Sequence, residues 1–161
     1  MRAKLRNSEI YVAAHVGIQR QVDNIQNGRE DAYGAEKDRG WQNHVEGALG
    51  EKAFAKAFGL YWSGHVGNLD ADDVGPYQVR TRSKHWHELI LHKKDMDDRP
   101  YALLTGLNGE YDIHGWMFAR DGKKEKYWKD PTGKGRWAYF VPQEDLNKDF
   151  DELMRLIEEL D

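Results

Sequence analysis

Apolar residues that recur every three or four positions predict a helix from Glu9 to Asn27. Ser8 is the expected N-cap, and Gly28 follows the end of the helix. The polar segment 28–40 after it is expected to be a loop. The apolar stripe of this helix consists of Ile10, Ala13, Ala14, Gly17, Ile18, Val22 and Ile25.

A second helix is predicted from Trp41 to Phe58, where apolar residues step by four. Gly47 and Gly50 are poor helix formers, so their presence within one turn predicts close approach by another backbone. Glu51 lies at the border of the apolar face and needs a partner there. It is interpreted as one half of a salt bridge, as a surface Glu whose charge extends into solvent, or as an accessory ligand of a metal or a water molecule.

Runs of alternating and β-branched residues predict strands in the rest of the chain. Asn108-Gly109 is a hairpin signal between two of these strands, and Asp149–Leu160 reads as a C-terminal helix. The expected fold is α+β or α/β, with one mixed central sheet flanked by helices in a single domain over residues 1–161. That domain divides into a helical part (8–58), a sheet core (60–141) and the last helix (149–160). The predicted strands are Leu60–Ser63, Tyr77–Arg82, Glu88–His92, Tyr101–Leu107, Tyr111–Ala119 and Trp137–Val141.

The composition indicates a soluble globular protein, since 39% of the 161 residues are hydrophobic and 32% are charged. The chain has no cysteine, which excludes disulfides, thiolate zinc sites and cysteine nucleophiles. No apolar run approaches the roughly 20 residues of a membrane helix, and the N-terminus lacks the apolar region of a signal peptide. We therefore expect a cytoplasmic protein.

Charge is distributed unevenly along the chain, although the net charge is only −4. Residues 120–136 carry seven Lys and Arg against three Asp and Glu, whereas 143–161 carry eight Asp and Glu against two Lys and Arg. The first segment predicts a local basic surface on an acidic protein.

The segment Asp70–Arg82 is expected to be a bent hairpin with a break at Gly75-Pro76. Gln78, Arg80 and Arg82 alternate with apolar residues on the second strand, so they share one face. Asp73 and Gln78 are expected to converge at one edge, which suits a divalent cation and an anionic substrate. Asp70 and Asp72 are the alternative acids; Asp73 is preferred because its five-residue gap to Gln78 fits a tight hairpin.

Two resemblances follow from these motifs. A helical Glu, a hairpin acid and a polar-x-basic triplet, here Glu51, the DADD run and Gln78-Val79-Arg80, resemble the PD-(D/E)xK, or restriction-endonuclease-like, nuclease superfamily. The segments GALGEKAFAKAFG, YQVRTR, HGWMFA and VPQEDL, spread over most of residues 41–146, are similar to those of a group of small bacteriophage proteins.

The first resemblance implies a Mg²⁺- or Mn²⁺-dependent nuclease acting on nucleic acid, with DNA the expected polymer. It implies Asp73 as main metal ligand, Gln78 and the Val79 carbonyl as further ligands, and Glu51 as a ligand through water. Gln78 replaces the usual acid and brings no charge. Arg80 replaces the usual lysine and cannot act as a base near neutral pH, but it can orient water or neutralise a phosphate.

Basic and aromatic residues near this segment are candidates for nucleic-acid contacts, because such side chains suit phosphates and unstacked bases. They are Arg82, Lys84, Trp86, Lys93 and Lys94; Trp128 and Trp137 also lie among basic residues. His85, His87 and His92 allow a zinc site as a minor alternative.

The alternatives to a nuclease are a nuclease-fold protein that binds nucleic acid without cleaving it, and a phage protein that binds a host defence protein. A homodimer would be needed for symmetric cleavage of two strands.

Overall fold

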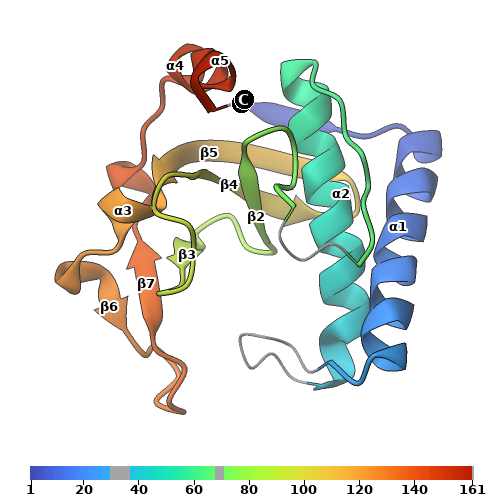
Figure 1. The fold of residues 1–161 in the computed structure, drawn as a ribbon, viewed down its shortest axis with the longest axis horizontal. Helices are drawn as coiled ribbons and strands as arrows, with labels where there is room; N and C mark the ends of the chain where they lie inside the picture. Colours follow the sequence, from blue (N-terminus) through green and yellow to red (C-terminus); the bar gives the residue numbers. More distant parts are fainter. Residues whose placement is uncertain (30–36, 68–70, 161) are drawn as a thin grey trace.

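Two long helices pack side by side and cover one face of a four-stranded sheet (Figure 1). The computed structural model describes residues 1–29, 37–67 and 71–160. Helix α1 spans Asn7–Gln26 and α2 spans Gly40–Phe58, so both predicted helices are confirmed to within two residues at each end. No helix in the described part of the chain is long and apolar enough to cross a membrane.

Helix α1 meets α2 through small residues, and this reverses part of the predicted stripe. Ala13 and Gly17 are buried, and a Cβ on Gly17 would lie 2.5 Å from the Val45 Cα of α2. The prediction that Ile18, Val22 and Ile25 face the core is wrong, because their exposed fractions are 42%, 39% and 58%. Because α1 and α2 cross closely at Gly17, the polar residues that follow Gly17 on its own face of the helix point toward α2. Ile18, Val22 and Ile25 point elsewhere.

The start of α1 also differs from the prediction. Ser8 lies inside the helix, and Arg6 is the N-cap. The Arg6 main-chain N–H donates to the Glu9 carboxylate at 2.7 Å, so a glutamate in the first turn satisfies the chain where the Ser8 hydroxyl was expected to do so. The same carboxylate accepts from Lys56 of α2 at 2.7 Å, which ties the two helices together.

The four-stranded sheet has the order β1-β5-β4-β2, with β1 at Arg2–Lys4, β5 at Glu110–Phe118, β4 at Pro100–Leu107 and β2 at Gln78–Arg82. Strand β2 runs parallel to β4, and the other pairs are antiparallel. The hairpin turn at Asn108-Gly109 is confirmed, with φ angles of 59° and 90°. The sheet is therefore mixed, as predicted, and β2 is an edge strand.

A second sheet covers the other face of β4, where a single central sheet had been predicted. It consists of β3 (Leu89–Leu91), β7 (Ala138–Val141) and β6 (Trp128–Lys129), in the order β3-β7-β6. Leu89, Leu91 and Val141 of this sheet share a buried cluster with Tyr101 and Leu103 of β4. The protein thus has three layers, namely helices, mixed sheet and small antiparallel sheet.

The remaining short elements are the helix α3 (Ala119–Gly122) and the 3-10 turns at Lys37–Arg39, Glu125–Tyr127 and Gln143–Asp145.

Segment Leu60–Ser63 is not a strand, which contradicts the prediction. Gly59 ends α2 in the left-handed conformation, at φ 66°, and the chain then continues without regular structure. Leu60 and Trp62 pack on the core, while Tyr61 is 85% exposed. Alternate burial thus exists here without strand pairing.

The C-terminal helix is divided into α4 (Phe150–Arg155) and α5 (Ile157–Leu160). Asp149 caps α4 by accepting the Glu152 N–H at 2.9 Å. Leu153 is fully buried in the same cluster as α1, α2 and the mixed sheet. The Tyr77 hydroxyl donates to the Leu153 carbonyl at 2.8 Å, so the end of the chain is fastened to the segment that leads into β2.

Candidate active site between the helices and the edge strand

The predicted tight turn at Gly75-Pro76 brings the acidic segment beside the start of β2. Val74 and Tyr77 exchange two main-chain hydrogen bonds, of 3.0 and 3.1 Å, across this turn, and Gly75 has a φ of 54°. Residues 71–73 before it form no regular strand, so the first arm of the predicted hairpin is reduced to one bridge. Asp70 lies outside the described residues.

Asp73 lies against the open edge of β2. Its carboxylate accepts the Val79 main-chain N–H at 2.7 Å. Because the N–H and C=O of one strand residue point to the same side, the Val79 carbonyl faces this edge as well. Burial and the nearby negative charge of Glu51 raise the pKa of Asp73 to about 7. At neutral pH this carboxyl group is therefore poised between its protonated and ionised forms.

Glu51 of α2 is buried and paired, so its salt-bridge interpretation is confirmed. Arg20 of α1 donates to both carboxylate oxygens, at 2.8 and 3.0 Å, and the Trp62 indole N–H adds a third bond of 2.9 Å. A bidentate guanidinium is the strongest side-chain partner for a buried carboxylate. It holds the Glu51 charge in a defined position near Asp73.

Glu51, Asp73 and Gln78 line one cavity of about 370 Å³, although they come from three separate parts of the fold. Polar side chains dominate its walls, and both signs of charge are represented. The described residues that line it are Arg20, Asp23, Asn24, Arg29, His44, Glu51, His65, Gly67, Ala71, Asp73 and Gln78. Three of the four predicted catalytic residues therefore share a space of the size that binds a small anionic group.

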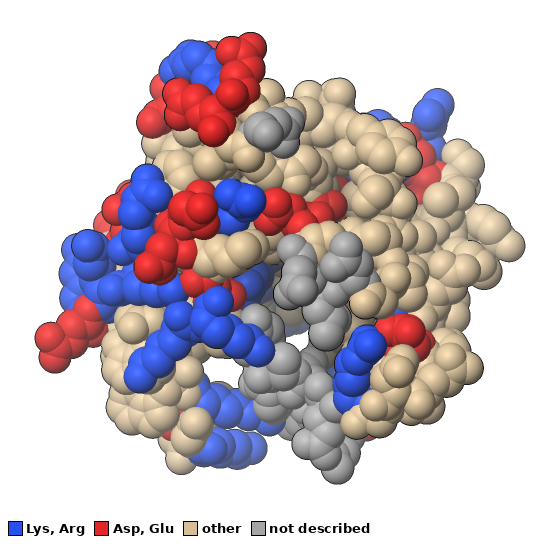
Figure 2. All heavy atoms as spheres, viewed as in Figure 1, with Lys and Arg blue, Asp and Glu red and all other residues tan. Residues whose placement is uncertain are grey.

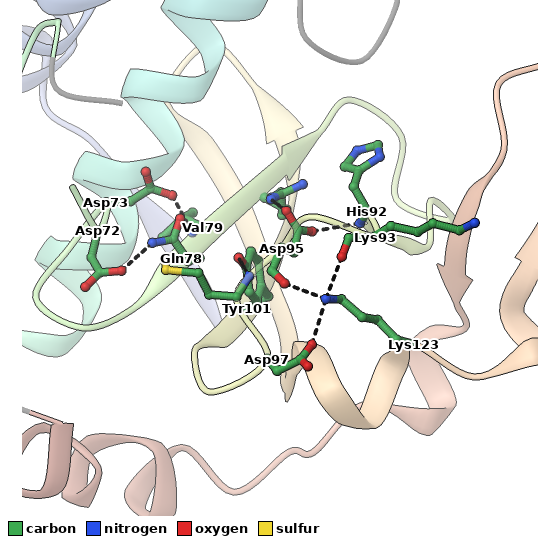
Figure 3. A network of polar contacts seen from close by, with 12 residues as sticks. Asp72, Asp73, Gln78, Val79, His92, Lys93, Asp95, Asp97, Tyr101 and Lys123 are labelled. Carbon is green, nitrogen blue, oxygen red and sulfur yellow. Dashed lines mark hydrogen bonds and ion pairs between the residues drawn. The ribbon is translucent and has the colours of Figure 1, made fainter. Parts of the chain in front are cut away.

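Gln78 and Arg80 lie on the same face of β2, as predicted, but that face is turned away from α2. Gln78 pairs in register with Tyr101, whose side chain belongs to the cluster between the two sheets. The Gln78 amide N–H donates to Asp72 at 2.6 Å (Figure 3). The Arg99 side chain also donates to Asp72, at 3.2 Å. Gln78 is the first residue of the edge strand, which explains how it still reaches the cavity.

Arg80, the fourth predicted catalytic residue, does not line the cavity. Its guanidinium forms an ion pair with Asp95 at 2.8 Å and lies 4.9 Å from the centre of the Tyr101 ring. Asp95 also accepts the His92 N–H, while Lys123 donates to the Asp95 main-chain oxygen (Figure 3). This network fastens β2 to the loop after β3. From there, the positive charge of Arg80 lowers the pKa of Asp73.

The donor set offers limited but usable ligands for a divalent cation. In the described part of the chain, no group of three or more His, Asp or Glu side chains is placed to hold a metal. The oxygens present at the edge of β2 are the Asp73 carboxylate, the Gln78 amide oxygen and the Val79 carbonyl. Mg²⁺ accepts one or two carboxylates and keeps several waters, so the types of these oxygens fit it.

The five predicted nucleic-acid-binding residues lie in two parts of the chain, one at the end of β2 and the turn after it, the other after β3. Arg82 ends β2, about 13 Å along the strand from Gln78, and donates to the Glu88 carbonyl at 3.1 Å. Lys84 and Trp86 follow in an exposed turn, with Trp86 63% exposed. The second group, Lys93 and Lys94, is exposed after β3. None of the five lines the cavity that contains Asp73.

The three histidines of the zinc alternative do not share a strand face. His85 lies in the turn after β2, and His92 follows β3. Burial and the positive charge of Arg82 lower the pKa of His87, which leaves its ring neutral near pH 7. Among the described residues, no cluster of three or more His, Asp or Glu side chains is placed to hold zinc.

Arg20 is the main residue that sequence reasoning missed. It lies seven positions after Ala13 and three after Gly17, on the face that meets α2. A charged residue that continues a stripe of small buried residues must find a partner on the neighbouring helix, and this signal is present in the sequence. Asn24 obeys the same rule and pairs with His44 at 2.8 Å.

Comparisons with protein-family models, with curated proteins and with solved structures found no match for this chain. Function therefore has to be inferred from the residues of the cavity.

Proposed function

We propose that the protein is a divalent-metal-dependent nuclease whose active site is the cavity lined by Glu51, Asp73 and Gln78. The observation that carries this proposal is the convergence of the three residues from α2, the turn segment and β2 on one polar cavity. The resemblance to the restriction-endonuclease-like superfamily rests on the same residues. The bacteriophage resemblance places such an enzyme in the cytoplasm of a host cell.

Asp73, Gln78 and the Val79 carbonyl would hold the cation at the edge of β2. When bound, Mg²⁺ or Mn²⁺ polarises a phosphodiester, lowers the pKa of a bound water and stabilises the leaving oxygen. A cation near Asp73 also favours its ionised form, since the raised pKa of this carboxyl comes from burial and a like charge. The uncharged Gln78 makes the site weaker than one with two carboxylates.

Two further cavity residues, Arg20 and His65, and the neighbouring Arg80 have defined tasks in this proposal. Arg20 pairs with Glu51 and offsets part of its charge, which reduces the repulsion between the cavity and an anionic phosphate. His65 lines the same cavity, where its ring nitrogens can form hydrogen bonds with a bound water or phosphate. Arg80 fixes β2 through Asp95 and takes no proton.

The direct test is cleavage of supercoiled plasmid and of an end-labelled single strand in Mg²⁺, Mn²⁺ or EDTA. Asp73→Ala is expected to abolish metal-dependent product, by at least about a hundredfold, while the protein keeps its circular dichroism spectrum. Asp98→Ala is the matched control, since this carboxylate is 71% exposed and lies outside the cavity. Full activity in a folded Asp73→Ala protein would refute the assignment.

A binding protein without hydrolytic activity is the second candidate, and one observation favours it. Arg20 and Trp62 already engage both Glu51 oxygens, so Glu51 has less capacity left to hold a metal or a water molecule, and Asp73 carries most of that task. This candidate predicts salt-dependent binding of nucleic acid that persists in EDTA, with no product after long incubation in any metal.

A further inference from the structure

Three aromatic rings gather at the free end of the small sheet. Trp128 of β6 pairs in register with Tyr139 of β7, and their ring centres are 4.7 Å apart. Trp137, immediately before β7, stacks on Trp128 at 5.9 Å with only 22° between the ring planes. We refer to Trp128, Trp137 and Tyr139 as the aromatic platform.

The platform extends the inner face of the small sheet beyond the core. Tyr139 alternates with Val141, which is fully buried between the two sheets, so the two side chains share a face. Trp137 belongs to the same face but is 54% exposed. The pattern thus carries an indole ring out of the core into solvent, next to two further rings.

Positive charge surrounds these rings. The Lys93 ammonium lies 4.7 Å from the centre of the Trp128 ring. Lys129 of β6 lies over Phe140, on the opposite face of β7 from Tyr139, and pairs with Glu88 at 2.9 Å. Seven Lys and Arg side chains lie in residues 120–136, against three acids. Figure 2 shows lysine and arginine side chains gathered on the side of the molecule that carries α3, β6 and β7, whereas acidic side chains gather over α4 and α5. The surface is therefore complementary to a polyanion.

A duplex does not satisfy such a surface, because its base faces are stacked inside and only phosphates are presented. A single strand presents both phosphates and unstacked bases, and a base stacked on an exposed ring contributes about 1–3 kcal/mol. From this combination we infer that the aromatic platform binds single-stranded nucleic acid, with a base stacked on Trp137 and a phosphate near Lys93.

This inference rests on the proposed function for the identity of the polymer. It adds that the substrate class is single-stranded nucleic acid. The loop after β3 contacts both the aromatic platform and strand β2, which leads to the cavity. Lys93 reaches the platform, and two residues later Asp95 holds Arg80, which is two residues from Gln78 at the cavity. The small sheet that carries the platform also covers the face of the mixed sheet on which Gln78 and its register partner Tyr101 lie.

The test is fluorescence anisotropy with labelled oligonucleotides in EDTA, where hydrolysis is absent. Unstructured DNA and RNA strands and a DNA duplex of equal length are compared, which also distinguishes the two sources of single strand. The wild-type protein is expected to bind at least one kind of single strand more tightly than the duplex. Trp137→Ala is expected to raise the Kd for that strand about tenfold, and Trp137→Phe to restore most of the affinity.

Two further variants separate a binding role from a structural one. Lys93→Ala is expected to lower the slope of log Kd against log salt concentration by about 0.7, the contribution of one phosphate contact in a single strand. Tyr11→Ala is the matched control; Tyr11 is 77% exposed on α1 and is expected to leave the Kd unchanged when replaced.

The outcomes distinguish this inference from the proposed function. No binding of single strands in EDTA, or binding that Trp137→Ala leaves unchanged, overturns the platform even if metal-dependent cleavage is found. Binding that needs Trp137, without cleavage in any metal, supports the platform and overturns the nuclease.

Discussion

At the scale of single residues, the buried Arg20–Glu51 pair determines what the cavity can do. Their side chains are 16% and 8% exposed, so solvent screens the pair weakly. Burial and the charge of Glu51 keep the Asp73 pKa high, and the Arg20 guanidinium offsets only part of this effect. The charge state of Asp73 is thus set by residues on two other elements.

This raised pKa predicts how stability depends on pH. The folded-state pKa of Asp73, about 7, exceeds the ordinary value of 3.8, so the folded protein binds the proton more tightly than the unfolded chain. The stabilising contribution is complete below about pH 4 and is lost as pH rises to about 7. Asp73→Asn keeps an oxygen for the Val79 N–H and carries no charge. It should therefore be more stable than wild type by about 4 kcal/mol at pH 8, and nearly equal to it at pH 4.

Urea denaturation in EDTA across this pH range measures the difference between the two proteins. Glu51, Arg20 and Arg80 are the charged groups that act on Asp73, so they are left unchanged in both. A stability difference that does not grow between pH 4 and pH 7 would show that Asp73 titrates at an ordinary pKa.

At the scale of elements, glycines set the distances between layers, and they do so unequally. A Cβ on Gly50 would meet the Thr81 side chain of β2, so β2 does approach α2 closely there, but with a side chain and not with the predicted backbone. A Cβ on Gly47, three residues earlier, would meet no described atom within 4 Å, so the prediction of close approach is wrong at that residue. Gly17 of α1 meets backbone atoms, which cannot rotate away.

Gly17→Ala is therefore predicted to destabilise the fold by about 1–3 kcal/mol, because the helix backbones must separate to admit a methyl group. Gly47→Ala is the matched control. It changes the same atoms within a helix but enters open space, and the better helix propensity of alanine should stabilise the protein by up to about 1 kcal/mol. Chemical denaturation of both variants checks the pair; destabilisation of similar size in both would mean that the α1–α2 contact is not the cause.

At the scale of the whole molecule, both ends of the chain are part of the main core. β1 pairs with β5, and Leu153 of α4 is buried among residues of α1, α2 and the mixed sheet. The C-terminal helices carry the acidic surface seen in Figure 2, yet their apolar side belongs to this core. The chain is therefore expected to unfold as one cooperative unit.

Leu153→Ala tests this expectation. It should lower stability by about 3 kcal/mol, since it leaves a cavity under α4, and the transition should remain single. Far-ultraviolet circular dichroism and tryptophan fluorescence are recorded on the same denaturation series, with the exposed Leu107 replaced by alanine as control. A separate early transition of the variant, seen by one probe only, would show that the C-terminal helices form an independent unit.

The sequence by itself determined the elements whose signals are local. Helical periodicity located α1 and α2, Asn108-Gly109 located the β4–β5 turn, and Gly75-Pro76 located the turn before β2. Alternation correctly placed Gln78 and Arg80 on one face. These features depend on neighbours within a few residues, where backbone preference and side-chain period act directly.

Only the tertiary structure decided which of these features meet. The division into two sheets, the pairing of Arg20 with Glu51 and the attachment of Arg80 to Asp95 all join segments far apart in sequence. Each depends on a helix crossing or a strand partner that no local pattern encodes. The physical reason is that burial energy depends on the surface opposite a residue, so an exposed Trp137 and a buried Val141 follow from the same alternating strand.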